Sequence, residues 1–275
     1  MEKYLKMIKR IKGAINVLLG RSFTVRNAKS VEVEIKKICP VCGNNVQQFE
    51  RLSDFYLQHL DEAGFIHPHL FETISIFGYS CPVCGASDRD RLYAMYISQT
   101  KYILNNSDFR FLDIAPSSSL QKFIKTSYPN INYRSADLMM ENVDDKVDLT
   151  NMHLYENDRF DFLICSHVLE HVVNDTLAIK ELYRVLKPGG KGIVMVPILL
   201  SLTEDYENPD AHTPLERWKH FGQDDHVRMY SKPGFIKKLE SAGFVVNQNG
   251  KDYFGKDLFL TNGIHSRSVL YIVEK

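Results

Sequence analysis

The sequence has no excess of charge of either sign and no apolar run long enough to span a bilayer. Over 275 residues, 34 Lys and Arg balance 34 Asp and Glu, so the chain lacks the positive charge of a protein whose main partner is nucleic acid. The apolar run near the N-terminus is too short and too broken by lysine to cross a membrane, and no small-residue cleavage site follows it. These absences disfavour nucleic acid as a partner and predict a cytoplasmic protein.

One segment departs from this charge balance. Residues 1–29 carry eight basic side chains against the single acid Glu2. Apolar residues recur there mostly at spacings of three and four, which predicts a basic amphipathic helix in an N-terminal arm, residues 1–30. Such a helix packs on the body of the protein or on a second subunit of a homodimer, or makes peripheral contact with an anionic membrane surface. The sequence leaves these alternatives open.

Cysteine is scarce, yet four of the five cysteines lie in two identical Cys-Pro-Val-Cys-Gly segments, residues 39–43 and 81–85. Two Cys-x-x-Cys knuckles supply the tetrahedral set of thiolates that is typical of structural zinc. Two disulfides or four free thiols are the alternatives; a cytoplasmic chain disfavours the first, and the duplicated motif disfavours the second. We therefore predict a zinc-binding module over residues 31–90, with an aromatic-rich inserted element between the knuckles. The predicted Zn²⁺ ligands are Cys39, Cys42, Cys81 and Cys84.

Strand and helix patterns alternate through the rest of the chain, which predicts an α/β fold. Apolar strands are expected at 109–114, 131–136, 160–166, 193–197, 244–247 and 268–273. Helices are expected at 91–105, from about 119 to 128, between 167 and the Lys-Pro-Gly-Gly turn at 187–190, and at 233–242. Ligands of parallel sheets bind at the carboxyl ends of the strands, so His167, Glu170 and His171 should lie on the ligand side.

Residues 160–171, Phe-Asp-Phe-Leu-Ile-Cys-Ser-His-Val-Leu-Glu-His, together with residues 181–197, closely resemble class I S-adenosylmethionine (SAM) dependent methyltransferases of the ubiquinone and menaquinone methylase type. The resemblance spans about Phe109 to Val273. It implies a Rossmann-like sheet of seven strands, closed by an antiparallel strand, with helices on both faces, over residues 91–275. It also implies an enzyme that transfers a methyl group from SAM.

The same resemblance predicts where SAM binds. The loop after the first strand has the family's acidic residue, Asp113, but carries alanine, proline and serines where family members have glycines. Asp137 matches the ribose ligand and Asp148 the carboxylate near the adenine; a helix cap or a surface carboxylate is the alternative for each. The expected cofactor-binding residues are Asp113, Ala115, Pro116, Ser117, Asp137, Leu138, Asp148, Leu149 and Ser166.

Methyl transfer is an in-line displacement, so the enzyme orients the acceptor and removes its proton where necessary. His167 and His171 are four residues apart, close to one face of the expected helix, and with His226 they are the candidate bases; helix capping or packing is the alternative. Residues 198–231 are long for an α/β connection, which favours a substrate lid over a solvated loop. The candidate substrate-binding residues are Arg89, Arg91, Glu170, Tyr206, Arg217, Asp225, Arg228 and Tyr230.

These patterns predict a SAM-dependent methyltransferase that modifies a small polar acceptor. Histidine bases suit a hydroxyl acceptor, and the combined motifs look like methyltransferases that act on sugars, nucleotide-sugars or glycan precursors. Two alternatives remain at this point. One is a ribosomal RNA methyltransferase with a zinc module, which the neutral charge disfavours, and the other is a catalytically degenerate scaffold.

Overall fold

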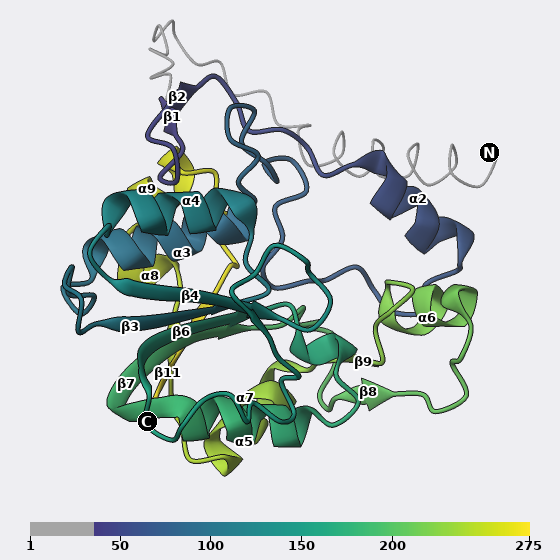
Figure 1. The fold of residues 1–275 in the computed structure, drawn as a ribbon. Coiled ribbons are helices and arrows are strands. Elements are labelled where there is room, and N and C mark those ends of the chain that lie inside the picture. Colours follow the sequence, from purple (N-terminus) through teal and green to yellow (C-terminus); the bar gives the residue numbers. More distant parts are fainter. Residues whose placement is uncertain (1–35) are drawn as a thin grey trace, which may run out of the picture. The chain divides into compact units, whose positions relative to one another are not determined.

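The computed structural model describes residues 36–275, so the predicted helix within residues 1–30 lies outside the described residues. A seven-stranded sheet is their central element (Figure 1). Its spatial order is β10 (Val245–Asn249), β11 (Leu270–Glu274), β7 (Leu186–Met195), β6 (Phe160–Ser166), β3 (Arg110–Ile114), β4 (Asn132–Asp137) and β5 (Asp145–Lys146). In this sheet β11 runs antiparallel to both of its neighbours, β10 and β7, and the other neighbouring pairs are parallel. The predicted seven-stranded sheet and its antiparallel closing strand are confirmed.

The order of the strands locates a ligand site. The chain builds the sheet outward from β3 to β4 and β5, and then returns to add β6 on the other side of β3. In open α/β sheets a ligand crevice forms at such a reversal, outside the carboxyl ends of the two strands. The site is therefore expected beyond Ile114 and Ser166.

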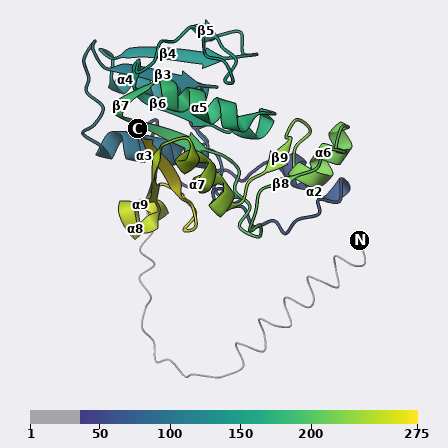
Figure 2. The ribbon, with the colours of Figure 1, turned by 90° about the horizontal axis from the view of Figure 1, so that it is seen from below.

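Helices cover both faces of the sheet. In Figure 1, α3 (Asp88–Gln99) and α4 (Ser118–Ser127) lie on one face, and α5 (Asp175–Val185) and α7 (Lys232–Ser241) lie on the other. The short helices α8 (Lys251–Phe254) and α9 (Lys256–Thr261) connect β10 to β11, and Figure 2 shows the two helices next to one another. Because helices cover it on both sides, β6 is apolar at almost every position, and Phe162, Leu163 and Cys165 have no exposed surface.

Several predicted boundaries shift for local reasons. The helix expected at 91–105 runs from Asp88 to Gln99, because Ser87 and Asp90 form a capping box that starts it earlier. His167 and His171 do not share a helical face: a 3-10 turn, η1 (Leu169–His171), follows β6, and α5 begins only at Asp175. The predicted Lys-Pro-Gly-Gly turn is an irregularity inside β7, where the register with β6 shifts.

Two additions to the sheet lie beside one another. The segment between the cysteine pairs contains α2 (Asp54–Glu62), and residues 198–231 contain β8 (Tyr206–Glu207), α6 (Pro214–Phe221) and β9 (Arg228–Met229). Figure 1 shows α2 beside α6, and the ring of Tyr56 in α2 meets Trp218 in α6 edge to face, with 5.7 Å between centroids. The first cysteine pair lies beside a small hairpin of β1 (Lys37–Ile38) and β2 (Asn45–Val46). Among the described residues, no helix is both long and apolar enough to cross a membrane.

Candidate active site and cysteine cluster

A cavity of about 240 Å³ opens at the carboxyl ends of β3 and β6, where the strand order predicts a ligand. Among its lining residues are four predicted cofactor residues, namely Asp113, Ala115, Ser117 and Ser166. Ser117 caps α4 by accepting the N–H of Leu120 at 3.2 Å, and its own hydroxyl donates to Asp90 at 2.9 Å. The serines that replace the usual glycines therefore start the helix and join it to α3.

The backbone is strained on both sides of this cavity. Ala115 has a φ of 51° and His167 a φ of 56°, in the left-handed region that favours glycine. Ala115 directly follows the last residue of β3, and His167 directly follows the last residue of β6. Alanine thus takes the backbone conformation for which glycine is the usual residue at this loop. Strain of this kind is often found at ligand sites.

Asp113 lies beneath the loop and is almost completely buried. Burial raises its pKa to about 7, aided by the nearby charge of Asp90 and opposed by the hydroxyl of Tyr133, which donates to its carboxylate at 2.6 Å. The carboxyl group is therefore poised to become ionised when a positive charge binds nearby.

The other predicted cofactor residues lie at the neighbouring strand end. Asp137 ends β4 and accepts two backbone N–H groups, from Met139 and Met140, with one carboxylate oxygen. Its second oxygen has no hydrogen bond within the described part of the chain. The side chains of Leu138 and Met139 are 57% and 82% exposed, and such exposed apolar groups suit a flat ring such as adenine.

Asp148 is an exposed carboxylate that accepts hydrogen bonds from the backbone N–H and the hydroxyl of Thr150. This geometry matches the alternative of a surface carboxylate. Leu149 is buried and Pro116 is also buried.

A second, smaller cavity of about 120 Å³ meets the first at two shared residues, Arg89 and His167. Its walls come from three parts of the chain, which are the segment between the cysteine pairs, the predicted lid, and the strand ends. Among the described residues, Arg89 makes one side-chain hydrogen bond, a 3.4 Å contact with the hydroxyl of Tyr79. A guanidinium with most of its donors unused thus lines both cavities.

Histidine and glutamate side chains converge at one end of the smaller cavity. Nδ1 of His167 lies 3.1 Å from Oε1 of Glu170, which is fully buried. Burial, reinforced by the charge of Arg89, lowers the pKa of His167 to about 4, so its ring is neutral at pH 7. Nε2 of His167 is buried and has no hydrogen-bond partner among the described residues. This nitrogen is therefore available to a ligand.

The two other histidines lie next to Glu170. His226 comes from the lid, and its Nε2 is 4.0 Å from Oε1 of Glu170, while its Nδ1 is 3.2 Å from the carbonyl oxygen of Phe221. His171 is partly exposed, and its Nδ1 is 3.2 Å from Oδ2 of the exposed Asp225. The three predicted base residues therefore lie around one carboxylate, although they do not share a helix.

Three predicted substrate residues have structural roles in place of a substrate contact. Arg91 is fully buried and donates all five of its guanidinium hydrogens to backbone carbonyls around the second knuckle and α9. Arg228 is buried, donates to three carbonyls between residues 169 and 173, and pairs with Glu207 at 2.8 Å. The hydroxyl of Tyr230 donates to Asp175 at 2.7 Å. These three side chains fix the lid and the knuckle to the body of the protein. Because their donors already have partners within the chain, they are not free to bind a substrate.

Two further predicted substrate residues belong to the lid. The hydroxyl of Tyr206 is 2.7 Å from Nδ1 of His220 inside the lid. Arg217 is partly buried in α6, and its Nε is buried with no partner in the described part of the chain. Neither residue lines the two joined cavities.

Sequence reasoning missed several cavity residues. The segment between the cysteine pairs contributes Tyr56, Thr73 and Tyr79 to the smaller cavity, and the lid adds Gln223. The one signal for this in the sequence is the high aromatic content of that segment, which predicts an inserted element but does not show what it lines. Tyr93 of α3 also lines the larger cavity and bonds to Ser166 at 2.8 Å.

The four cysteines of the two knuckles come together. Sγ of Cys39 lies 3.8 Å from Sγ of Cys84, and Sγ of Cys42 lies 4.0 Å from Sγ of Cys81. Four thiolates at about 2.3 Å from one tetrahedral ion would be about 3.8 Å apart, whereas a disulfide requires about 2.05 Å. The two knuckles have matching turns, in which Gly43 and Gly85 both have a φ of 73°. The cluster therefore fits a tetrahedral ion, and the disulfide alternative does not fit these distances.

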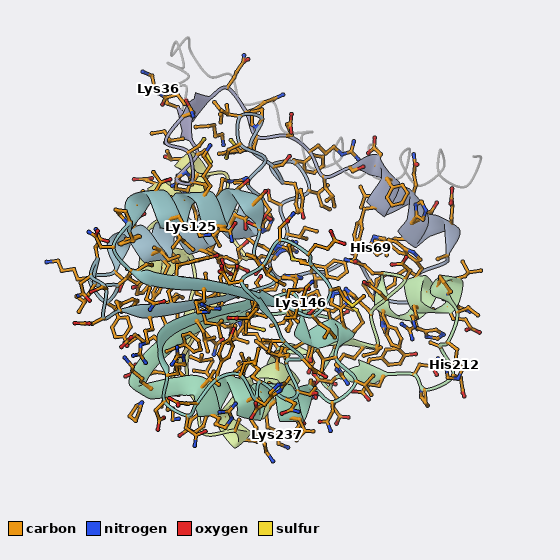
Figure 3. The ribbon with its side chains drawn as sticks, viewed as in Figure 1. Lys36, His69, Lys125, Lys146, His212 and Lys237 are labelled. Carbon is orange, nitrogen blue, oxygen red and sulfur yellow. The ribbon has the colours of Figure 1, made fainter. Side chains whose placement is uncertain are left out.

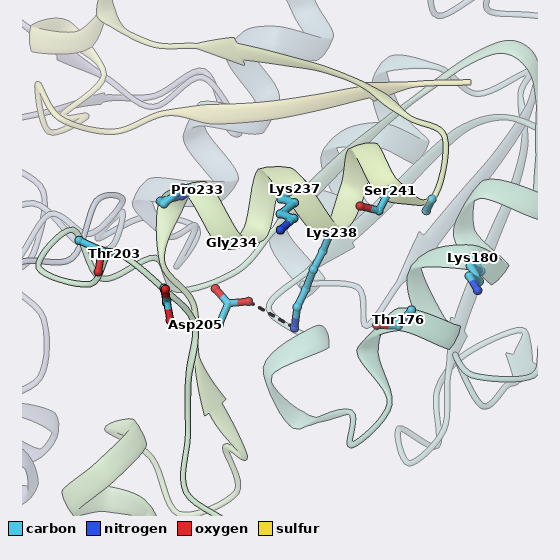
Figure 4. A pocket seen from close by; sticks show the side chains of 11 residues that line it. Thr176, Lys180, Thr203, Asp205, Pro233, Gly234, Lys237, Lys238 and Ser241 are labelled. Atoms are coloured by element: carbon cyan, nitrogen blue, oxygen red, sulfur yellow. Dashed lines mark ion pairs between the residues drawn. The ribbon is translucent and has the colours of Figure 1, made fainter.

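A larger hollow, of about 650 Å³, lies between α5 and α7 (Figure 4). Its lysines include Lys238, which pairs with Asp205 at 3.3 Å and with Asp175. It holds none of the predicted site residues and lies on the face of the sheet opposite α3 and α4. Its size alone does not make it the active site.

The strand order and the crevice beside the two strand ends define a Rossmann-like SAM-dependent methyltransferase. A family profile described as a methyltransferase domain matches residues 81–249, more than half of the chain, and the chain belongs to this family. It is therefore a SAM-dependent methyltransferase, which confirms the predicted enzyme class and cofactor. No curated protein matches the chain.

Solved structures of similar fold include a SAM-dependent methyltransferase from Archaeoglobus fulgidus, with 14% identity, a TM-score of 0.44, and 69% of this chain and 95% of that chain covered. An O-methyltransferase family protein from Burkholderia thailandensis has 15% identity, a TM-score of 0.46, and coverage of 68% and 57%. The phosphoethanolamine N-methyltransferase 2 of Haemonchus contortus has 12% identity, a TM-score of 0.45, and coverage of 72% and 55%. Identities this low say nothing about the acceptor.

Proposed function

We propose that the enzyme transfers the methyl group of SAM to a hydroxyl of a small polar acceptor, such as a sugar, a nucleotide-sugar or a glycan precursor. The observation that carries this proposal is that Arg89 and His167 line both cavities. A cofactor in the larger cavity would direct its sulfonium methyl toward an acceptor in the smaller one. The small volume and polar lining of the second cavity favour a compact hydroxylated group.

His167 is proposed to take the proton of the acceptor. The carboxylate of Glu170 lies 3.1 Å from Nδ1, and its negative charge favours the tautomer in which Nδ1 carries the hydrogen and the unpartnered Nε2 carries the lone pair. As the acceptor oxygen attacks, its new O–CH₃ bond forms, the C–S bond breaks, and the electron pair stays on sulfur to give S-adenosylhomocysteine (SAH). The acceptor proton passes to Nε2.

Arg89 and Asp113 are proposed to bind the two charged ends of the methionine part of SAM. The guanidinium of Arg89 suits the carboxylate, and the carboxyl of Asp113 suits the ammonium group. Asp137 is proposed to accept the ribose hydroxyls with its free oxygen, and Leu138 and Met139 to cover the adenine. The helix cap at Ser117 holds the loop that lies between these groups.

The cysteine cluster is proposed to hold a structural Zn²⁺ bound by Cys39, Cys42, Cys81 and Cys84. All four positions around the ion are then filled by protein, so zinc contributes folding free energy and not a site for substrate. The second knuckle leads directly into α3, which carries Arg89. The ion would therefore fix the start of a helix that lines both cavities.

The test is a screen of sugars and nucleotide-sugars with SAM as methyl donor, with SAH release as the readout. We expect a substrate whose turnover falls 10²- to 10⁴-fold in His167→Ala, with little change in SAH affinity. His153→Ala, which changes an exposed histidine outside both cavities, is the control. An accepted substrate that His167→Ala methylates at the normal rate would contradict the assignment of the base.

A further inference from the structure

Glu170 is a buried carboxylate without a hydrogen bond. Its side chain has no exposed surface, and neither of its oxygens has a hydrogen-bond partner among the described residues. The 3.1 Å approach of His167 Nδ1 is an ion-pair distance, but it is not aligned as a hydrogen bond. A carboxylate removed from water in this way is costly unless a positive charge compensates it.

The side chains around Glu170 are those that bind transition metals. Glu170, His171 and His226 each have a carboxylate oxygen or a ring nitrogen near a common point, and these three atoms lie within 4.8 Å of one another. Metal ligands about 2.1 Å from a shared ion lie within about 4.2 Å of each other, so a small closure would complete the site. His171 is partly exposed, and rotation of its side chain is the simplest way to close it.

The outer contacts of the two histidines match those of metal-binding imidazoles. A carbonyl oxygen or a carboxylate that accepts from one ring nitrogen leaves the other nitrogen with its lone pair for the ion. In His226, Nδ1 faces the carbonyl oxygen of Phe221 at 3.2 Å, and Nε2 faces Glu170. In His171, Nδ1 faces the carboxylate of Asp225 at 3.2 Å. Both rings thus have an outer partner that fixes their orientation.

We propose that Glu170, His171 and His226 bind a first-row divalent transition cation at the end of the acceptor cavity. One carboxylate and two imidazoles suit Mn²⁺, Co²⁺, Ni²⁺ or Zn²⁺. Its remaining positions would face the cavity, because His226, one of the three ligands, lines it. The ion would compensate the buried charge, orient the acceptor hydroxyl and favour loss of its proton. This catalytic role rests on the proposed O-methylation, whereas the binding of the ion does not.

The proposed cation site takes its ligands from two segments, the lid and the body of the protein, where these two segments are in contact. Glu170 and His171 belong to the turn after β6, and His226 belongs to the lid. The N–H of Val227 donates to the carbonyl oxygen of Glu170 at 2.9 Å, so the two segments are already joined beside the ligands. A cation here would hold the lid against the strand end.

The experiment is a titration of the full zinc-loaded chain with Mn²⁺, followed by electron paramagnetic resonance. Mn²⁺ is the probe because it prefers oxygen and nitrogen ligands, so the cysteine cluster does not compete for it. We expect one Mn²⁺ per chain and a loss of affinity of at least tenfold in His171→Ala and in Glu170→Gln. The control is His212→Ala, which removes an exposed histidine of the same lid, at its outer edge in Figure 3.

His171→Ala keeps the test decisive if Glu170→Gln fails to fold, because His171 is partly exposed. Absence of bound Mn²⁺ in the wild-type chain, or Mn²⁺ binding that His171→Ala leaves unchanged, would overturn the proposal. A parallel titration with SAH separates the two hypotheses. SAH binding without Mn²⁺ binding removes the cation site alone, whereas Mn²⁺ binding without SAH binding removes the proposed methyl transfer and leaves the cation site in place.

Discussion

The strained loop after β3 gives a prediction in which one kind of substitution has opposite effects at two positions. Ala115 has a φ of 51°. The left-handed region costs an L-residue about 1–2 kcal/mol, and replacing alanine with glycine costs about 0.5–1 kcal/mol in the entropy of the unfolded chain. Ala115→Gly should therefore raise the free energy of unfolding by about 0.5–1 kcal/mol. The proposed SAM site adjoins this loop, and glycine leaves more room for a ligand beside the backbone, so SAH should bind at least as tightly.

The matched control is Ala178→Gly in the middle of α5, where Ala178 has no exposed surface. The lower helix propensity of glycine costs about 1 kcal/mol, and the loss of a buried methyl group costs about 0.8 kcal/mol. The free energy of unfolding of Ala178→Gly should therefore be about 2 kcal/mol lower than that of the wild type. Urea unfolding monitored by circular dichroism measures both changes. A loss of stability in Ala115→Gly similar to that in Ala178→Gly would refute the argument from strain.

Three further predictions concern charge and metal. Cys81→Ser should abolish binding of one zinc per chain and lower the free energy of unfolding by more than about 3 kcal/mol, measured by metal analysis and urea unfolding. Arg89→Lys should weaken SAH binding about tenfold, because an ammonium group cannot make the two-point contact of a guanidinium with a carboxylate. Its free energy of unfolding should stay within about 0.5 kcal/mol of the wild-type value. Burial raises the pKa of Asp113 to about 7, so the stability that its protonated form contributes is complete below about pH 4 and is lost as pH rises through 7. Asp113→Asn should thus be stabilised relative to wild type by an amount that grows toward pH 8, to at most about 4 kcal/mol.

Each of these has an outcome that would contradict it. Zinc retained in Cys81→Ser would exclude the four-cysteine site, and Cys165→Ser is its control because that thiol lies outside the cluster. Equal SAH affinity in Arg89→Lys and wild type would remove the carboxylate contact. A stability difference between Asp113→Asn and wild type that does not change with pH would show that folding does not raise the pKa of Asp113.

The sequence predicts the fold well because the apolar strands are long and regular. Strands such as Phe160–Ser166 are buried on both faces, and this alone makes nearly every position apolar. The exact ends of helices depend on single contacts, such as the capping box of Ser87 and Asp90, and the spacing of apolar residues does not reveal these contacts. The helix expected after His167 is present as α5 but begins later for the same reason, because Asn174 caps it seven residues further on.

The active site was only partly predictable. Residues at strand ends, such as Asp113 and His167, follow from topology, so the sequence locates them. Whether a donor is free depends on distant segments, and Arg91 shows this: its partners include carbonyl oxygens of Asn262 and Gly263, more than 170 residues away. The cavity wall formed by Tyr56 and Gln223 likewise joins two insertions whose contact no local pattern contains.

The most direct test of the account is an isothermal titration of the purified chain with SAM and with SAH, in wild type and in Asp137→Ala. The account predicts binding near micromolar, about −8 kcal/mol, that weakens at least tenfold in the variant because the ribose hydroxyls lose their carboxylate. Absence of binding for both ligands in the folded wild-type protein would contradict it.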